Sequence, residues 1–212
     1  MSVLKIDNVC KTIKDQVILE NISLELQSGD VYGLIGRNGS GKTMLLRSIA
    51  GLMKPTSGTI TYNGKLLYKD LSFLPSIGIV IENIDLYPEF TGFDNLMMLS
   101  RVKGTIGKSE VENALKRVGL DPHDKRTVRK YSLGMRKKLS IAQAIMEMPD
   151  VILLDEPTSA LDEQSVDDIR RIIKEEKERG ALIIITSHNS DDISILCDKI
   201  YKMENGKIRG NP

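Results

Sequence analysis

The feature that most restricts the fold is a glycine-rich run between a short apolar segment and a helical pattern. It reads Gly36-Arg37-Asn38-Gly39-Ser40-Gly41-Lys42-Thr43, the spacing G-x-x-x-x-G-K-[ST]. Val31–Ile35 before it is predicted as a buried strand, and Lys42–Ala50 after it as a helix. The glycines allow backbone N–H groups to point at phosphate oxygens, and the helix N-terminus adds its positive dipole end. The run therefore predicts a phosphate-binding loop in an α/β domain, and a chance glycine turn is the weaker alternative.

The last two residues of this loop have the chemistry that a nucleotide requires. Lys42 can reach the β- and γ-phosphates, and the Thr43 hydroxyl can ligate Mg²⁺. We expect all eight residues of the run to contact the nucleotide. GTPases, kinases and transporters share such a loop, so it predicts nucleotide binding without saying what the nucleotide drives.

A second motif is an apolar strand, Val151–Leu154, that ends in Asp155 and Glu156. Four apolar residues in a row fit a central strand buried on both faces. Ligands of open α/β sheets lie at the carboxyl ends of the strands. Asp155 is therefore predicted on the metal side and Glu156 as the general base that activates water. Such a pair is weak alone, because acidic residues often follow strands, but it is strong beside the phosphate loop.

The pattern along the chain predicts αβ alternation that is interrupted once. Helical spacing dominates from Leu86 to Met146, so residues 86–146 are predicted as a helical lobe, and 1–85 with 147–212 as the core. Further strands are expected at Val3–Val9, Ile22–Leu26, Thr59–Tyr62, Ile77–Ile81 and Leu182–Thr186, with a closing hairpin at Lys199–Lys202 and Lys207–Arg209. Helices are expected at Asp94–Arg101, Ser109–Val118, Gly134–Met146, Gln164–Arg179 and Asp191–Leu196.

Composition narrows the function classes. The chain has 212 residues, with 30 basic and 29 acidic side chains and a formal net charge of +1. This balance lacks the basic surplus of a nucleic-acid binder, so no nucleic-acid partner is predicted. The apolar runs are strand-length, and the N-terminus lacks the pattern of a signal peptide. Two separate cysteines are typical of a reducing cytoplasm.

Three further segments resemble the motifs of one known family, the ABC (ATP-binding cassette) transporter ATPases. Tyr131-Ser132-Leu133-Gly134-Met135 resembles the family's signature, usually written L-S-G-G-Q. Asp155-Glu156-Pro157-Thr158-Ser159-Ala160-Leu161-Asp162 is similar to its acidic strand end and the following loop. Thr186-Ser187-His188 is similar to its switch histidine. The resemblance covers nearly the whole chain. It implies a P-loop NTPase, RecA-like core with an N-terminal antiparallel β subdomain and an inserted α-helical subdomain.

The resemblance also implies roles for individual residues. Ser132 and Gly134 would face the γ-phosphate of the ATP held by a second subunit, and Asp162 would join the two sites. His188 would contact the γ-phosphate and the attacking water. With Lys42 and Glu156, His188 completes the predicted catalytic set. Ser132 as a plain helix cap and His188 as an ordinary strand-end residue are the alternatives. Arg136, Lys137 and Lys138 are expected on a solvated helix face.

Three positions depart from the family pattern. Ile13 stands where many members stack an aromatic ring on adenine, which predicts modest ATP affinity and weak purine selectivity. Glu82 stands where the family usually has glutamine. It is predicted to contact nucleotide or Mg²⁺ and to sharpen metal dependence, with a plain polar strand end as the alternative. Leu133 and Met135 replace glycine and glutamine of the signature, whereas Ser132 and Gly134 are retained.

The family implies ATP and Mg²⁺ as cofactors, a head-to-tail homodimer that encloses two ATP molecules, and a separate multi-span membrane permease. It places the chain at the cytoplasmic face of the membrane. Three features together are similar to the ATPases of bacitracin-type and lantibiotic-type exporters: the Ile81-Glu82 strand end, the stretch from Leu86 to Leu96, and Ser132-Leu133-Gly134-Met135. This resemblance implies export of a peptide, antibiotic or other amphiphile. The alternatives are a ribosome- or DNA-acting ABC ATPase, a P-loop kinase or GTPase, and a regulatory nucleotide-binding module.

Overall fold

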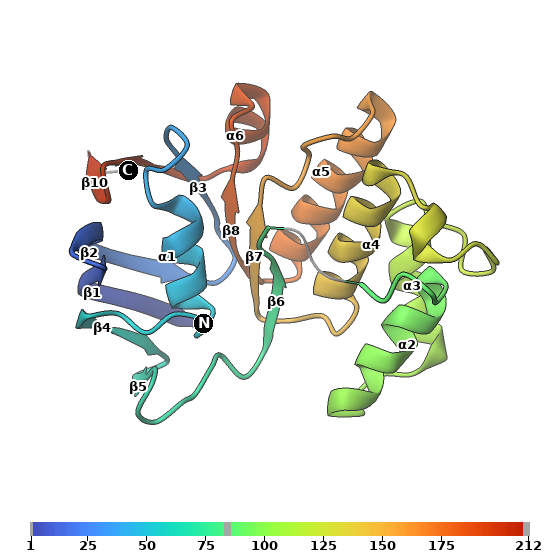
Figure 1. The fold of residues 1–212 in the computed structure, drawn as a ribbon, viewed down its shortest axis with the longest axis horizontal. Coiled ribbons are helices and arrows are strands. Elements are labelled where there is room, and N and C mark those ends of the chain that lie inside the picture. Colours follow the sequence, from blue (N-terminus) through green and yellow to red (C-terminus); the bar gives the residue numbers. More distant parts are fainter. Residues whose placement is uncertain (1, 83–85, 210–212) are drawn as a thin grey trace.

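A computed structural model describes residues 2–82 and 86–209 (Figure 1). The strands are β1 (Val3–Ile13), β2 (Gln16–Gln27), β3 (Val31–Ile35), β4 (Ser57–Tyr62), β5 (Lys65–Leu66), β6 (Ile77–Val80), β7 (Val151–Asp155), β8 (Leu182–Thr186), β9 (Lys199–Glu204) and β10 (Lys207–Arg209). The helices are α1 (Lys42–Ile49), α2 (Gly92–Lys103), α3 (Lys108–Arg117), α4 (Leu133–Ile145), α5 (Glu163–Glu178) and α6 (Ser190–Leu196), with a 3₁₀ turn at Val128–Lys130.

The strands form two sheets. An antiparallel sheet has the order β2-β1-β4-β5, and a six-stranded sheet has the order β10-β9-β3-β8-β7-β6. In the second sheet β9, β3, β8, β7 and β6 pair in parallel, and β10 joins β9 as an antiparallel hairpin. Parallel strands need crossover helices, which explains the αβ alternation of the sequence. The predicted α/β class with an N-terminal antiparallel sheet is confirmed.

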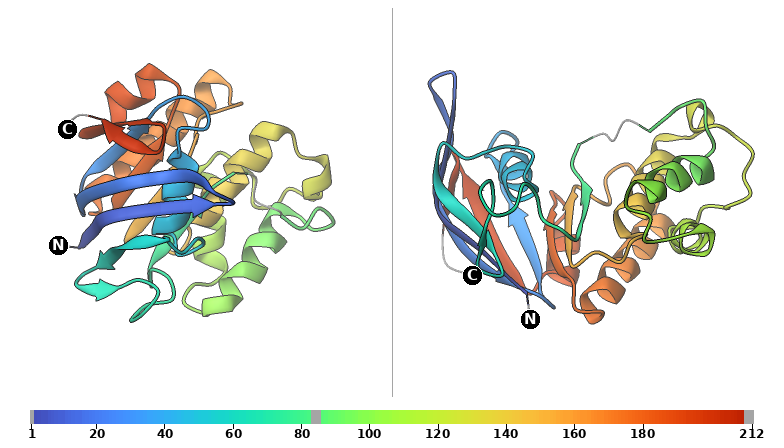
Figure 2. Two further views of the ribbon diagram at one scale, coloured as in Figure 1. Left: turned by 60° about the vertical axis from the view of Figure 1, so that its left-hand side comes forward. Right: turned by 90° about the horizontal axis from the view of Figure 1, so that it is seen from below.

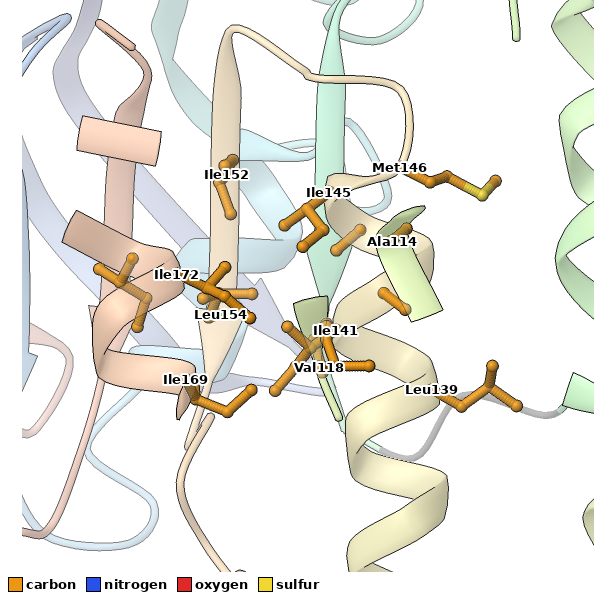
Figure 3. Close-up of a cluster of buried hydrophobic side chains, with 14 of the residues drawn as sticks. Ala114, Val118, Leu139, Ile141, Ile145, Met146, Ile152, Leu154, Ile169 and Ile172 are labelled. Carbon is orange, nitrogen blue, oxygen red and sulfur yellow. The ribbon is translucent and has the colours of Figure 1, made fainter. Parts of the chain in front are cut away.

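The six-stranded sheet separates two hydrophobic cores, because successive side chains of a strand point to opposite faces. Val151 and Leu153 of β7 pack with α1 and the antiparallel sheet. Ile152 and Leu154 pack with α4 and α5 on the other face, as Figure 3 shows. The views in Figure 2 agree, since the antiparallel sheet and α1 lie on one side of the parallel strands and α4 and α5 on the other. The two helices that lead from the phosphate loop and from the signature therefore belong to different cores.

Strand β6 and helix α4 touch through their backbones. A Cβ at Gly78 of β6 would collide with the carbonyl oxygen of Ala144, near the end of α4. Only glycine allows this approach, so the end of α4 lies directly on the strand. This contact joins the helical lobe to the sheet.

Some boundaries differ from the predictions. Strands β1 and β2 are longer than expected and meet at a two-residue turn, Lys14 and Asp15, with positive φ angles of 46° and 66°. Asn8 and Asn21 also have positive φ, near shifts in the β1–β2 register. Helix α2 begins at Gly92, before the predicted Asp94, because the Thr91 side chain caps it by accepting from Asp94 N.

Candidate nucleotide site

The phosphate loop, defined here as residues 36–43, follows β3 and leads directly into α1. Gly39 and Gly41 have φ angles of 78° and 105°, which side chains disfavour, and Gly41 is the N-cap of α1. A Cβ at Gly36 would lie 2.7 Å from Ser40 Oγ. The loop therefore curls tightly, as its glycine spacing predicts.

Lys42 is buried at the start of α1, with 7% of its surface exposed. Its Nζ donates to the carbonyl oxygens of Gly36, at 2.7 Å, and Arg37, at 3.3 Å. Burial of an ammonium group is costly unless polar groups surround it. The loop carbonyls meet that requirement and hold the positive charge within the curve of the loop.

Asp155, at the carboxyl end of β7, contacts the first turn of α1 and the carboxyl end of β8. Its Oδ2 accepts from Thr43 Oγ1 at 2.7 Å, and its Oδ1 accepts from Thr186 Oγ1 at 2.5 Å. Thr186 Oγ1 also accepts from Glu156 N at 3.0 Å. The predicted metal-side residues Thr43 and Asp155 are thus in direct contact. Thr186, which holds the Asp155 carboxylate in place, was not predicted as a site residue.

Glu156 and His188 lie together beside the loop. Glu156 Oε2 accepts from His188 N at 3.2 Å, and Glu156 Oε1 lies 3.2 Å from His188 Nε2. The same Nε2 is 2.8 Å from Asn38 Oδ1 of the phosphate loop. Glu156 has a φ of 51°, an unusual backbone conformation that is typical of functional positions. Base, imidazole and phosphate loop therefore meet at one point.

Lys137 corrects one expectation. It was predicted on a solvated face, but its Nζ donates to the backbone oxygen of Asp155 at 3.1 Å. Burial lowers the pKa of Lys137, while the charges of Asp155 and Glu156 act in the opposite direction. A positive charge from α4 therefore lies next to both acidic residues of β7.

The signature segment, residues 131–135, begins α4. Ser132 is the N-cap, and its Oγ accepts from Met135 N at 3.1 Å. Leu133 is 56% exposed although it is apolar. The free N-terminus of α4 and the phosphate loop at α1 lie on opposite sides of β7 (Figure 1). Within one chain, Ser132 and Gly134 are therefore not part of the cluster around Lys42.

Two of the residues that depart from the family pattern, Ile13 and Glu82, occupy exposed positions. Ile13 ends β1, and 40% of its surface is exposed. Glu82 has a φ of 60°, and its Oε2 lies 2.6 Å from Arg47 Nη2 of α1. The Glu82 carboxylate therefore has a cationic partner on the helix that follows the phosphate loop.

Asp162 begins α5. Its Oδ1 accepts from Ser165 N at 2.9 Å, and its Oδ2 accepts from Ser165 Oγ at 3.0 Å. The backbone hydrogen bond from Ser165 lowers the pKa of this carboxyl. Ala160 O, just before it, lies 3.4 Å from where a Cβ of Gly134 would be. The loop between Glu156 and Asp162 therefore also touches the signature segment.

The residues present fit a bound nucleotide and its metal. A cleft of about 920 Å³ borders residues 36–40 of the phosphate loop, His188 and the β9–β10 hairpin. Ser40 Oγ at the cleft and Glu156 Oε1 beside His188 are buried without a hydrogen-bond partner in the described residues. Across residues 2–82 and 86–209, no cluster of three His, Cys, Asp or Glu side chains suits a metal. Thr43 and Asp155 suit Mg²⁺ instead, since it takes few protein ligands and uses substrate phosphates.

Comparison with known proteins agrees with this geometry. Residues 19–159 match the family model described as ABC transporter. YybJ of Bacillus subtilis, an ABC transporter ATP-binding protein, is 48% identical over 95% of this chain and 92% of its own length. The lantibiotic transport ATP-binding protein SrtF of Streptococcus pyogenes is 36% identical over 97% and 88%. The bacitracin transport ATP-binding protein BcrA of Bacillus licheniformis is 35% identical over 98% and 68%.

A solved structure has the same fold. The dimeric structure of MJ0796, a bacterial ABC transporter cassette, superposes with a TM-score of 0.88 and 25% identity. The match covers 99% of this chain and 97% of that one.

Proposed function

The chain belongs to the ABC transporter family of ATP-binding proteins, and on that premise we propose how its residues bind and hydrolyse ATP to drive a membrane partner. The chain is an ATP-binding and ATP-hydrolysing subunit of this transporter class. The resemblance to bacitracin and lantibiotic transport ATPases is confirmed as well. We propose the roles of individual residues, the bound metal, the partners and the location of the chain.

The phosphate loop holds the β- and γ-phosphates of ATP. Backbone N–H groups of residues 36–41 donate to phosphate oxygens, and Lys42 turns its Nζ from the loop carbonyls toward them. Ile13 contacts adenine through an apolar surface alone. Its exposure of 40% at the end of β1 supports this assignment.

Thr43 and Asp155 would hold Mg²⁺. A bound ion would supply positive charge that offsets the negative charge of the phosphates. The Thr43–Asp155 hydrogen bond supports this pair, because it places both oxygens side by side. Glu82 contributes to the same region from the end of β6, with its charge offset by Arg47.

Glu156 is the general base, and His188 holds the γ-phosphate. Glu156 accepts a proton from the attacking water as the water approaches in line with the leaving oxygen. His188 donates toward the phosphate from Nε2, the atom that now lies beside Asn38 and Glu156. Contact between the base and the phosphate-binding imidazole supports their joint action.

Two copies form a head-to-tail dimer that encloses two ATP molecules. The free N-terminus of α4 in one copy, with Ser132 and Gly134, faces the γ-phosphate on the other, and Asp162 joins the two sites. Exposure of Leu133 and of Ser132 at the α4 N-terminus supports this arrangement, because a second copy can approach both residues. MJ0796, which is similar, has been solved as a dimer.

A separate multi-span permease carries the substrate across the membrane. No described helix is both long enough and apolar enough to cross a bilayer. Residues 86–146, the helical lobe, and the segment at Glu82 grip cytoplasmic parts of that permease, which places the chain at the cytoplasmic face of the membrane. Relatives named for bacitracin and lantibiotic transport support export of a peptide, antibiotic or similar amphiphile.

The observation that carries the proposal is the convergence of Lys42, Thr43, Asp155, Glu156 and His188 at the carboxyl ends of three parallel strands. We test it with Glu156→Gln. Loss of the base should reduce phosphate release at least about a hundredfold while ATP still binds, so that ATP traps a dimer on size-exclusion chromatography. Glu163→Gln, on the exposed start of α5, is the control. Near-normal hydrolysis by Glu156→Gln would exclude the base role.

A further inference from the structure

A buried carboxylate outside the predicted site ties together the segments that carry the base and the switch histidine. Asp192 lies in the first turn of α6, and its surface is fully buried. A buried charge must be paired and hydrogen-bonded to be tolerated. Each oxygen of Asp192 meets that requirement with a different set of partners.

One oxygen of Asp192 accepts hydrogen bonds from two hydroxyl groups. Asp192 Oδ2 accepts from Thr158 Oγ1 and, at 3.1 Å, from Ser187 Oγ. Thr158 stands two residues after Glu156, and Ser187 stands immediately before His188. Both hydroxyl-bearing residues are buried, with 8% and 3% of their surfaces exposed.

The other oxygen of Asp192 pairs with the positive charge of an arginine. Asp192 Oδ1 lies 2.9 Å from Nε and 2.8 Å from Nη2 of Arg170, on α5. Both nitrogens contact the same oxygen, so Arg170 anchors Oδ1 and offsets the charge of the carboxylate. The oxygen Oδ2 is left to the two hydroxyl groups.

These contacts close a ring. From Asp192 the chain of contacts runs through Ser187 to His188, whose backbone N donates to Glu156 at 3.2 Å. It then returns through Thr158 to Asp192. A displacement of either segment must break a buried hydrogen bond, so the ring resists relative movement of base and histidine.

We propose that Asp192 is a positioning residue for hydrolysis, holding the Glu156 and His188 segments in register through Thr158 and Ser187. The inference rests on the roles proposed above for Glu156 and His188. In this role Asp192 acts through the two hydroxyl groups and not on the reacting atoms. Misplacement of a catalytic group by about 1 Å can cost about a hundredfold in rate.

The sharpest test removes the hydroxyl group of Thr158 and keeps the shape of its side chain. Thr158→Val should lower kcat about ten- to a hundredfold, with the Kd for ATP unchanged, because the phosphate loop is not disturbed. Thr158→Ser restores the hydroxyl and should restore kcat. Asp192→Asn should act in the same direction, and Asp191→Asn, exposed on the same turn, is its matched control.

A second measurement does not depend on hydrolysis. The chain has two histidines, so the imidazole NMR signals of His188 can be assigned against those of exposed His123. Without nucleotide, Thr158→Val should shift the His188 signals and leave those of His123 in place. Thr158→Ser should return them.

The outcomes separate this inference from the function it rests on. Unchanged kcat and unchanged His188 signals in Thr158→Val would overturn it, as would a lower melting temperature with normal kcat. Near-normal hydrolysis by Glu156→Gln would instead remove the base role, and the NMR comparison would still decide whether the ring positions His188. If Asp192→Asn does not fold, the Thr158 pair decides alone.

Discussion

The phosphate loop and the signature segment are both loops that lead into a helix, yet their side chains are held in opposite ways. Lys42 is 7% exposed and is satisfied by carbonyls of its own loop, and Thr43 bonds to Asp155 of the central sheet. Ser132 only caps its own helix, and Leu133 beside it is 56% exposed. The first segment is a finished cradle inside one chain. The second is an exposed segment, which we propose contacts the other subunit of the dimer.

The largest expected effect tests the finished cradle. Lys42→Ala removes the only charge that the loop itself buries, so ATP binding by the monomer should fall and phosphate release should drop at least about a hundredfold. The measurement is ATP affinity by isothermal titration together with a phosphate-release assay. Lys54→Ala, outside the loop, is the control. If the variant binds ATP normally, the cradle does not depend on its lysine.

The next effect tests the outward surface. Gly134→Asp places a carboxylate where a second copy's γ-phosphate should approach, so ATP-driven dimerisation and hydrolysis should fall about tenfold or more. ATP affinity of the monomer should stay unchanged, because the cradle is on the other side of β7. Light scattering with ATP and titration of the monomer measure the two quantities.

Val102→Asp is the matched control, since it adds the same charge at an exposed position of α2. A loss of monomer ATP affinity in Gly134→Asp would contradict the claim that the signature segment is separate from the phosphate loop of its own chain.

A smaller effect concerns the adenine end of the cradle. Ile13→Tyr adds a ring that can stack, and base–aromatic stacking contributes about 1–3 kcal/mol. The Kd for ATP should therefore fall by a factor between about five and a hundred. Preference for ATP over a pyrimidine triphosphate should rise as well. Val17→Tyr, at an exposed position of β2, is the comparison. An unchanged Kd in Ile13→Tyr would remove Ile13 from the site.

The smallest effect concerns the pair that links the cradle helix to the end of β6. The side chains of Arg47 and Glu82 are 37% and 55% exposed, so the pair should contribute less than about 1 kcal/mol to stability. Arg47→Ala should leave the melting temperature nearly unchanged and alter the Mg²⁺ concentration that gives half-maximal hydrolysis. Identical Mg²⁺ dependence would mean that Glu82 does not act near the metal.

Motifs made of neighbouring residues were predictable, and contacts between distant segments were not. The phosphate loop needs glycines at fixed spacing, and Asp155-Glu156 needs an apolar strand before it, so both can be recognised locally. Asp191 and Asp192 are the same residue type side by side, and only the packing of α6 decides which is buried. Lys137 looks like its neighbours Arg136 and Lys138, and only the approach of α4 to β7 reveals its contact with Asp155.

The fold shows the same division. Strand β3 and helix α1 follow from apolar patterning, which is a property of short segments. The β1–β2 turn was missed because Lys14 and Asp15 are not the asparagine and glycine that favour positive φ. Those two residues adopt the turn because long strands on each side pair around them. Strand pairing depends on contacts between two segments, so it cannot be recognised from one segment alone.

The backbone contact at Gly78 holds the C-terminal end of α4 against β6, so a tilt of α4 about this contact would move its N-terminal end the most. Ala144 and Leu133 are separated by about 17 Å of helix, from the rise of about 1.5 Å per residue. A tilt of about 5° at this contact moves the tip, where Ser132 lies, by roughly 1.5 Å. Hydrogen bonds to phosphate do not survive such a displacement. In the proposed dimer, a displacement of β6 that tilts α4 by this amount would therefore break the contact of Ser132 with the phosphate held by the other subunit.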